Sequence, residues 1–189
     1  MESALIVSSS EKGSAFFSEI LNVASIGQIA VMKSCSEARR LLMERDFDLV
    51  VVNAPLSDES GESLSRYISS KYMSQVILAV KSEYFDAASA ACEGDGVLTV
   101  SKPLNRAVFW SALSLARSAQ SKIKRVQAEN TQLKQRIEDI KTIDRAKCIL
   151  ISNFSMSENE AHRHIEKQAM DKRIPKKEAA KEIIGEFSF

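Results

Sequence analysis

The sequence predicts an α/β domain with a doubly wound, five-stranded parallel sheet, followed by a long coiled-coil helix and a small three-helix domain. In residues 4–100, short apolar runs alternate with helical segments. No proline or glycine occurs between Pro103 and Pro175, which favours long helices there. The last part of the chain has the caps and breaks of short helices. We place the three parts at residues 1–118, 119–142 and 143–189.

The five apolar runs are Ala4–Val7, Gly27–Val31, Asp48–Val52, Gln75–Val80 and Gly96–Val100. Helical segments lie between them, at about residues 12–22, 35–45, 61–72 and 83–93. Near-continuous apolar strands are typical of a parallel sheet that is covered by helices on both faces. The strict alternation of strand and helix therefore predicts a doubly wound domain, whose functional crevice lies at the carboxyl ends of the strands.

The net charge of +1 conceals two halves of opposite sign. Residues 1–104 hold 9 Lys+Arg and 14 Asp+Glu, which gives −5, whereas residues 105–189 hold 17 and 11, which gives +6. A polyanionic partner is therefore expected to bind the second half. The simpler explanation is that solvated helices carry more lysine and arginine.

The three cysteines, Cys35, Cys92 and Cys148, are odd in number and lack the spacing of a metal site, as expected for reduced thiols. The sequence has no secretory signal pattern and no apolar run that is long enough to span a membrane. We expect a cytoplasmic protein without a membrane segment, a bound metal or a cofactor.

The first part resembles a response-regulator receiver domain over residues 3–115. The matching residues are the strand Asp48–Val52 with Asn53, Pro55 and Gly61 after it, and the turn Ser101–Leu104. The resemblance implies a site that accepts phosphate on an aspartate and holds Mg²⁺ on acidic side chains.

That chemistry is missing from this sequence. Asn53 stands at the phosphoacceptor position, and an amide is a poor nucleophile. Ser8 and Ser9 stand where the resemblance implies acidic magnesium ligands, and hydroxyls alone hold Mg²⁺ weakly. Lys102 is the one matching residue of the phosphate site, and we expect it to pack or hydrogen-bond near its turn. We interpret the domain as a pseudo-receiver, a scaffold for dimerisation or for a regulatory protein or ligand.

The middle part carries an apolar seam with coiled-coil spacing. Its residues are Ile123, Val126, Asn130, Leu133, Ile137 and Ile140, and Ala112, Ala116 and Ala119 continue the phase backwards. A single asparagine at an a position favours a parallel two-stranded coiled coil, because its amide pairs with its twin. Glu129 and Lys134 of the partner helix would attract each other, whereas Arg136 and Lys141 would repel. The seam predicts a parallel homodimer; the alternative is one long helix packed on its own first domain.

The last part is predicted to hold three short helices. Ile143, Ala146 and Leu150 share one face, and a break follows at residues 152–156. Ser157 and Glu160 form a capping-box pattern before a second helix, whose inward stripe is Ala161, Ile165 and Ala169. A third helix opens at Pro175, carries apolar residues at 179–180 and 183–184, and is predicted to stop at Gly185.

This tail resembles the ANTAR RNA-binding module of bacterial transcription antiterminators. The matching blocks are Ile143–Lys147, Ser157-Glu158, Glu160-Ala161, Gln168–Arg173, and Ala180 with Ile183-Ile184. Cys148 and Ser155 depart from the usual glycine, His162 from a common aromatic residue, and Pro175 from a common serine or threonine. The resemblance implies an RNA-binding regulator that, as a dimer, binds paired stem-loops in a nascent leader transcript and prevents terminator formation.

The candidate RNA-binding residues lie in or beside these blocks. They are Arg145, Lys147, Arg163, Lys167, Gln168, Met170, Lys172 and Arg173. Arg163, Lys167 and Met170 share a second stripe of the middle helix, where the cations can contact phosphates and the thioether can contact an unstacked base. The alternative is that the two cations pair with Glu160 or Glu166 and that Met170 belongs to the core.

Three other functions remain open. A DNA-binding response regulator needs base-reading side chains near the start of its recognition helix, whereas the Gln168–Arg173 block lies at a helix end. A protein-binding adaptor would use the same tail. An enzyme is disfavoured, because no nucleophile–base constellation is visible and His162 and His164 point to different faces.

Overall fold

The computed structural model describes residues 1–187 and has two compact units, Met1–Lys124 and the chain from Arg125 onward. The elements of the first unit are β1 (Ser3–Val7), α1 (Glu11–Val23), β2 (Gln28–Met32), α2 (Cys35–Glu44), β3 (Leu49–Asn53), α3 (Glu62–Lys71), β4 (Gln75–Lys81), α4 (Phe85–Cys92), β5 (Leu98–Lys102) and the start of α5 (Arg106–Phe154). Single 3₁₀ turns, η1 (Ser82–Tyr84) and η2 (Glu93–Asp95), flank α4.

The five strands form one parallel sheet in the order β2-β1-β3-β4-β5, which confirms the predicted fold class. The register pairs Val7 with Val52, Asn53 with Ala79, and Lys81 with Lys102. The carboxyl ends of the strands therefore meet at one edge of the sheet.

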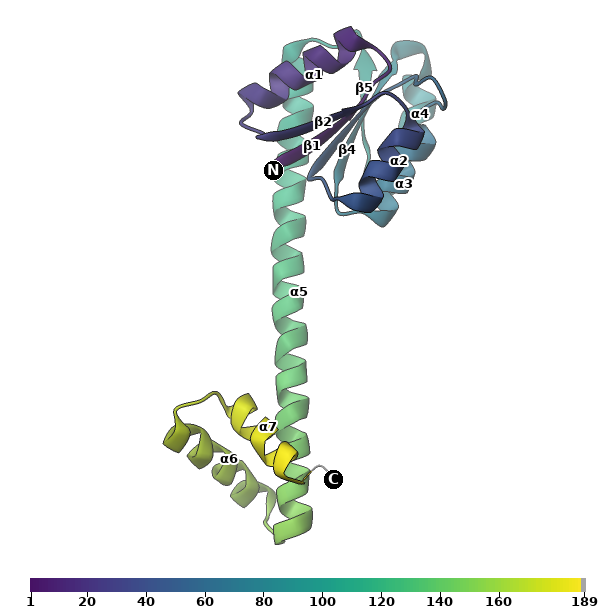
Figure 1. Ribbon diagram of the computed structural model, residues 1–189. Coiled ribbons are helices and arrows are strands. Elements are labelled where there is room, and N and C mark those ends of the chain that lie inside the picture. Colours follow the sequence, from purple (N-terminus) through teal and green to yellow (C-terminus); the bar gives the residue numbers. More distant parts are fainter. Residues whose placement is uncertain (188–189) are drawn as a thin grey trace. The chain divides into compact units, whose positions relative to one another are not determined.

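Both faces of the sheet are buried, as the apolar strands predict (Figure 1). Leu5, Val50 and Leu78 pack with α2, α3 and α4 on one face. Their neighbours along the same strands pack with α1 and α5 on the other face. Each fully buried aliphatic side chain contributes about 1.5–3 kcal/mol, so the two cores dominate the stability of this unit.

The start of α5 belongs to the core of the first unit. Ala112 and Ala116 are buried there together with Phe109 and Leu113. The backward extension of the coiled-coil seam through these alanines is therefore wrong. Small side chains at these positions let the helix lie close against the sheet.

The second unit contains the rest of α5 together with α6 (Glu158–Lys172) and α7 (Lys176–Phe187). One apolar core joins the three helices, as their spacing predicts. Its buried members are Ala146, Leu150, Ala161, Ile165, Ala169, Ala179, Ala180 and Ile183. The capping box of Ser157 and Glu160 is also present.

Two predicted boundaries are wrong. The break expected at residues 152–156 is shorter, because α5 continues to Phe154 and α6 follows directly after Ser157. Helix α7 also runs past Gly185 to Phe187, since a single glycine weakens a helix but does not end it when neighbouring turns are packed. None of the described helices is long and apolar enough to cross a membrane.

Asp48 connects three segments of the first unit. Its carboxylate accepts the backbone N–H of Glu2 at 2.6 Å and lies 2.7 Å from the Lys124 ammonium. Burial alone would raise the pKa of Asp48, but the Lys124 ammonium and the Glu2 N–H outweigh it and lower the pKa to about 2. The ionised form is thus favoured in the folded protein.

We predict that Asp48→Asn lowers the free energy of unfolding by about 1–2 kcal/mol at pH 7. Because the folded pKa is depressed, this contribution is complete above about pH 4 and is lost as the pH falls towards about 2. Denaturant unfolding of wild type and variant across this range measures the difference. Asp46→Asn, at an exposed site two residues away, is the control. A difference that does not change with pH would contradict the role of the ionised carboxylate.

Candidate nucleic-acid interface

The carboxyl edge of the sheet holds the residues that the sequence analysis placed at the phosphate site of a receiver. Asn53 ends β3 and Ser8 follows β1, and both are buried. The Asn53 amide donates from Nδ2 to the Ser8 hydroxyl at 2.9 Å, and that hydroxyl donates to the Ser10 carbonyl at 2.9 Å. The Gly13 backbone lies so close that an added Cβ would be 2.3 Å from Asn53 Nδ2. The two side chains therefore bond each other in a tightly packed site.

Lys102 and Ser9 lie at the same edge. The Lys102 ammonium donates to the Ala54 carbonyl, and the Ser9 hydroxyl makes a long contact of 3.5 Å with the Pro55 carbonyl. Burial, and then the charge of Lys81, lower the pKa of Lys102. The lysine thus holds the loop after β3, which agrees with the packing role expected from the sequence.

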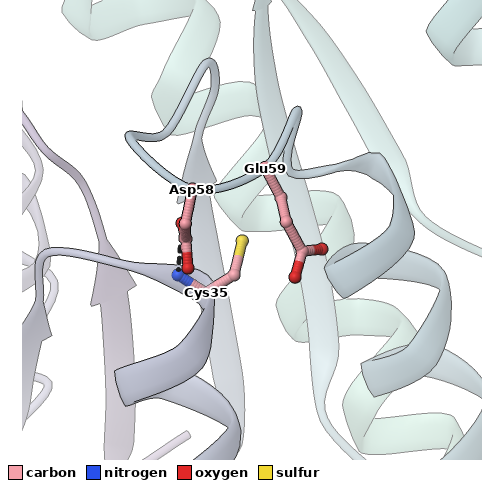
Figure 2. Close-up of side chains that lie close together, drawn as sticks. All are labelled: Cys35, Asp58 and Glu59. Atoms are coloured by element: carbon pink, nitrogen blue, oxygen red, sulfur yellow. Dashed lines mark hydrogen bonds between the residues drawn. The ribbon is translucent and has the colours of Figure 1, made fainter.

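A thiol and two carboxylates meet where the loop after β3 approaches α2 (Figure 2). Asp58 accepts the backbone N–H groups of Cys35 and Ser36, each at 3.0 Å, and these bonds lower its pKa to about 2. Glu59 forms a two-pronged ion pair with Arg39. Burial, followed by the charges of Asp58 and Glu59, raises the pKa of the Cys35 thiol to about 12. The carboxylates cap α2 and bind Arg39 while the thiol stays protonated, so we assign the cluster a structural role.

The outward face of α6 carries the exposed part of the predicted RNA site. Arg163, Lys167 and Met170 are all exposed, and Met170 retains 77% of its accessible surface. Neither cation forms an ion pair with another residue in the described range 1–187. The alternative ion pairs with Glu160 or Glu166 are not formed: Glu160 accepts from Ser157, and Glu166 pairs with Lys176. The charge of Arg163 still contributes to lowering the pKa of Glu160. Two unpaired cations and an exposed thioether therefore share one surface.

Three other predicted RNA-binding residues already have partners. The Lys147 ammonium lies 2.8 Å from Asp144 and 3.1 Å from Glu158, and its side chain is only 17% exposed. Lys172 pairs with Glu182 at 2.6 Å. The Gln168 amide donates to that same carboxylate at 3.2 Å. These contacts join the helices of the unit, so the polar groups of these three side chains already have partners within the protein.

The last two predicted residues are exposed but lie elsewhere. Arg145 projects from α5. Arg173 caps the end of α6 with a left-handed backbone, φ 55°, and its N–H bonds the carbonyls of Ala169 and Met170. A non-glycine residue in this region costs of order 1–3 kcal/mol.

A hollow of about 430 Å³ adjoins the two unpaired cations at the turn between α5 and α6. Arg163 and Lys167 contribute to its lining, together with Glu160, Ser155, His164 and two residues that the sequence did not single out, Phe154 and Met156. The sequence could have identified Phe154 from its position, because an aromatic residue directly before a helix break is exposed unless another element covers it.

The fold and the site define a receiver-fold domain that is joined through a long helix to a small helical unit with a basic surface. Residues 131–184 match the ANTAR domain family. The chain therefore combines a receiver-like domain with an ANTAR domain, as the two resemblances predict.

This chain is similar to several known proteins, among them two curated relatives and one solved structure. The transcriptional regulatory protein PdtaR of Mycobacterium tuberculosis is 26% identical over 137 residues, which cover 72% of this chain and 67% of the relative. The aliphatic amidase regulator of Pseudomonas aeruginosa is 30% identical over 93 residues, which cover 49% and 46%. The receiver domain of an HD domain-containing protein from Pseudomonas fluorescens has a TM-score of 0.58 at 23% identity, with coverage of 65% and 91%. Both curated relatives are named as regulators.

We predict that neither wild type nor Asn53→Asp takes up phosphate from acetyl phosphate, with or without Mg²⁺. The single substitution supplies a carboxylate but no acidic partner to hold the metal, and it buries a charge beside Ser8. Intact-mass spectrometry measures incorporation, and the triple variant Asn53→Asp, Ser8→Asp, Ser9→Asp is the comparison. Stoichiometric incorporation of phosphate into the receiver-like domain of the wild-type protein would overturn the pseudo-receiver interpretation.

Proposed function

We propose that this protein is an RNA-binding regulator that prevents transcription termination. The observation that carries the proposal is the unpaired basic surface of α6 within the ANTAR domain. RNA loops present unstacked bases and closely spaced phosphates, which suit exposed cations beside an apolar side chain. In this role the protein acts in the cytoplasm, on paired stem-loops of a nascent leader transcript.

The charge distribution along α6 supports RNA over duplex DNA. A recognition helix usually contacts DNA bases through its first residues. The first turn of α6 instead carries Glu158 and Glu160, whose charges repel phosphates. The cations lie further along, at Arg163 and Lys167, on the flank of the helix. This arrangement fits a loop that is contacted from the side.

In this proposal, the receiver-like domain (residues 1–118) is a pseudo-receiver that binds a regulatory partner or a second copy of the chain. A hollow of about 260 Å³ at the carboxyl edge of the sheet is lined by Pro55, Glu62, Lys81 and Tyr84, among others. It offers both charges and an aromatic ring, which suits a regulatory protein or a ligand.

The seam on α5 supports a parallel dimer. In the single chain Ile123, Val126, Leu133, Ile137 and Ile140 are 36–58% exposed. Such a stripe costs free energy in water, and a second copy of the helix would bury it with the spacing of a coiled coil. A dimer would bring two ANTAR domains to one RNA, which matches paired stem-loops.

We predict that Leu133→Asp makes the protein monomeric, because each helix of the dimer would bury one unpaired carboxylate in the seam. Gln132→Asp, on the neighbouring outward position, removes no seam contact and should remain dimeric. Sedimentation equilibrium at tens of micromolar distinguishes the two. A wild-type protein that is monomeric at that concentration would contradict the dimer.

We predict that Arg163→Ala and Lys167→Ala each weaken binding to a two-hairpin leader RNA roughly three- to tenfold at physiological salt. Each should also flatten the salt dependence by about 0.7 if one phosphate contact is lost. Met170→Ala should weaken binding with little change in salt slope, as lost contact with a base would. Filter binding across a salt series measures these effects, and circular dichroism verifies the fold.

Lys181→Ala is the matched control, because it removes the same charge from an α7 lysine that is paired with Glu178. Lys147→Ala should reduce stability more than it changes the salt slope, since the ammonium is already paired. If all three α6 variants bind RNA like wild type, the proposal that this surface of α6 contacts RNA is wrong. Tighter binding to duplex DNA would favour the DNA-binding regulator, and a protein partner that binds independently of salt would favour the adaptor.

A further inference from the structure

The hollow between the end of α5 and the first turns of α6 has a chemistry that differs from the cationic surface beside it. Phe154 lies at the end of α5 with 52% of its surface exposed, and Met156 lies in the turn. His164 adds a second flat ring to the lining. The hollow has a volume of about 430 Å³ and is widely open to solvent, so a planar group of the size of a nucleobase can lie against its rings.

The residues that line the hollow carry one negative and two positive charges. Bonds from the N–H and hydroxyl of Ser157, and then the charge of Arg163, lower the pKa of the Glu160 carboxyl, so the group is ionised. Arg163 and Lys167 have no ion-pair partner among residues 1–187. A neutral base can lie beside the carboxylate without repulsion while its flanking phosphates contact the two cations.

The aromatic platform is held in place before any ligand binds. Phe154 packs edge-to-face with Phe187, with ring centroids 5.5 Å apart and planes at 85°. Ser155 takes a left-handed backbone, φ 54°, and the capping box fixes the next residues. A fixed platform loses little conformational entropy on binding, which increases affinity.

We propose that this hollow is a base-binding subsite, in which one unpaired RNA base stacks on Phe154 while its flanking phosphates contact Arg163 and Lys167. The inference rests on the proposed RNA-binding function and goes further, because it assigns a base site to residues outside the α6 cationic stripe. The Oε1 oxygen of Glu160 has no hydrogen-bond partner among residues 1–187, so it can accept an N–H from the edge of the base.

The test uses the full-length protein and a library of hairpin RNAs with one constant stem and randomised loops. The tightest hairpin is selected with wild-type protein, and its loop bases are then removed one at a time as abasic sites. Affinities are measured for wild type, Phe154→Leu and Phe154→Tyr, with Trp110→Leu, at an exposed ring of the first unit that does not line the hollow, as the matched loss of an aromatic ring. Thermal unfolding by circular dichroism verifies each fold.

The proposal expects Phe154→Leu to weaken binding roughly tenfold or more without a change in salt slope, and Phe154→Tyr to bind like wild type. One abasic position should weaken wild type by the same factor yet have no further effect on Phe154→Leu, because both changes remove one stacking contact. Glu160→Gln, which retains the capping box, should change the base preferred at that loop position alone.

Two results would overturn the subsite and are distinguishable from each other. If no hairpin is enriched by wild type, the proposed RNA function fails and the subsite fails with it. If hairpins are enriched and Arg163→Ala weakens binding, but Phe154→Leu binds like wild type or adds to every abasic change, RNA binding stands and the subsite is wrong. Binding of a peptide to the hollow in competition with the selected RNA would identify a protein site instead and would also overturn it.

Discussion

The structure depends on one continuous helix that contributes to two hydrophobic cores. The first turns of α5 bury Phe109 and Leu113 against the sheet, and its last turns bury Ala146 and Leu150 against α6 and α7. Between these ends no glycine or proline interrupts the backbone hydrogen bonds. The apolar seam in the middle section of α5 is exposed, because neither hydrophobic core covers it. That unburied seam is the physical reason to expect a second copy.

The first unit has the fold of a receiver domain, and the polar groups at the carboxyl edge of its sheet form hydrogen bonds within the protein. Asn53 donates to Ser8, and Lys102 donates to a backbone carbonyl. Side-chain groups that are buried and paired in this way stabilise the loops that hold them. Asn53, Ser8 and Lys102 thus have structural partners at this edge of the sheet.

The small helical unit divides its charges between structure and surface. Lys147, Lys172 and Lys176 pair with carboxylates of neighbouring helices, so they support the packing of a unit whose core is small. Surface ion pairs of this kind contribute little individually, but together they fix how the helices meet. Arg163 and Lys167 remain unpaired beside a hollow with aromatic and thioether groups. The unit therefore presents a distinct face on which charge and apolar surface adjoin.

The sequence by itself determined the five strands, the order of the elements, the long helix and the inward stripes of the tail, because each depends on local periodicity and caps. It also placed Asn53 and Ser8 at the carboxyl ends of their strands, where the structure has them. Only the tertiary structure decided which cations are available. Lys147 and Arg163 look alike in sequence, yet one lies between Asp144 and Glu158 and the other is unpaired. Likewise, the hollow beside Phe154 exists because a turn places α6 against the end of α5, which no local pattern specifies.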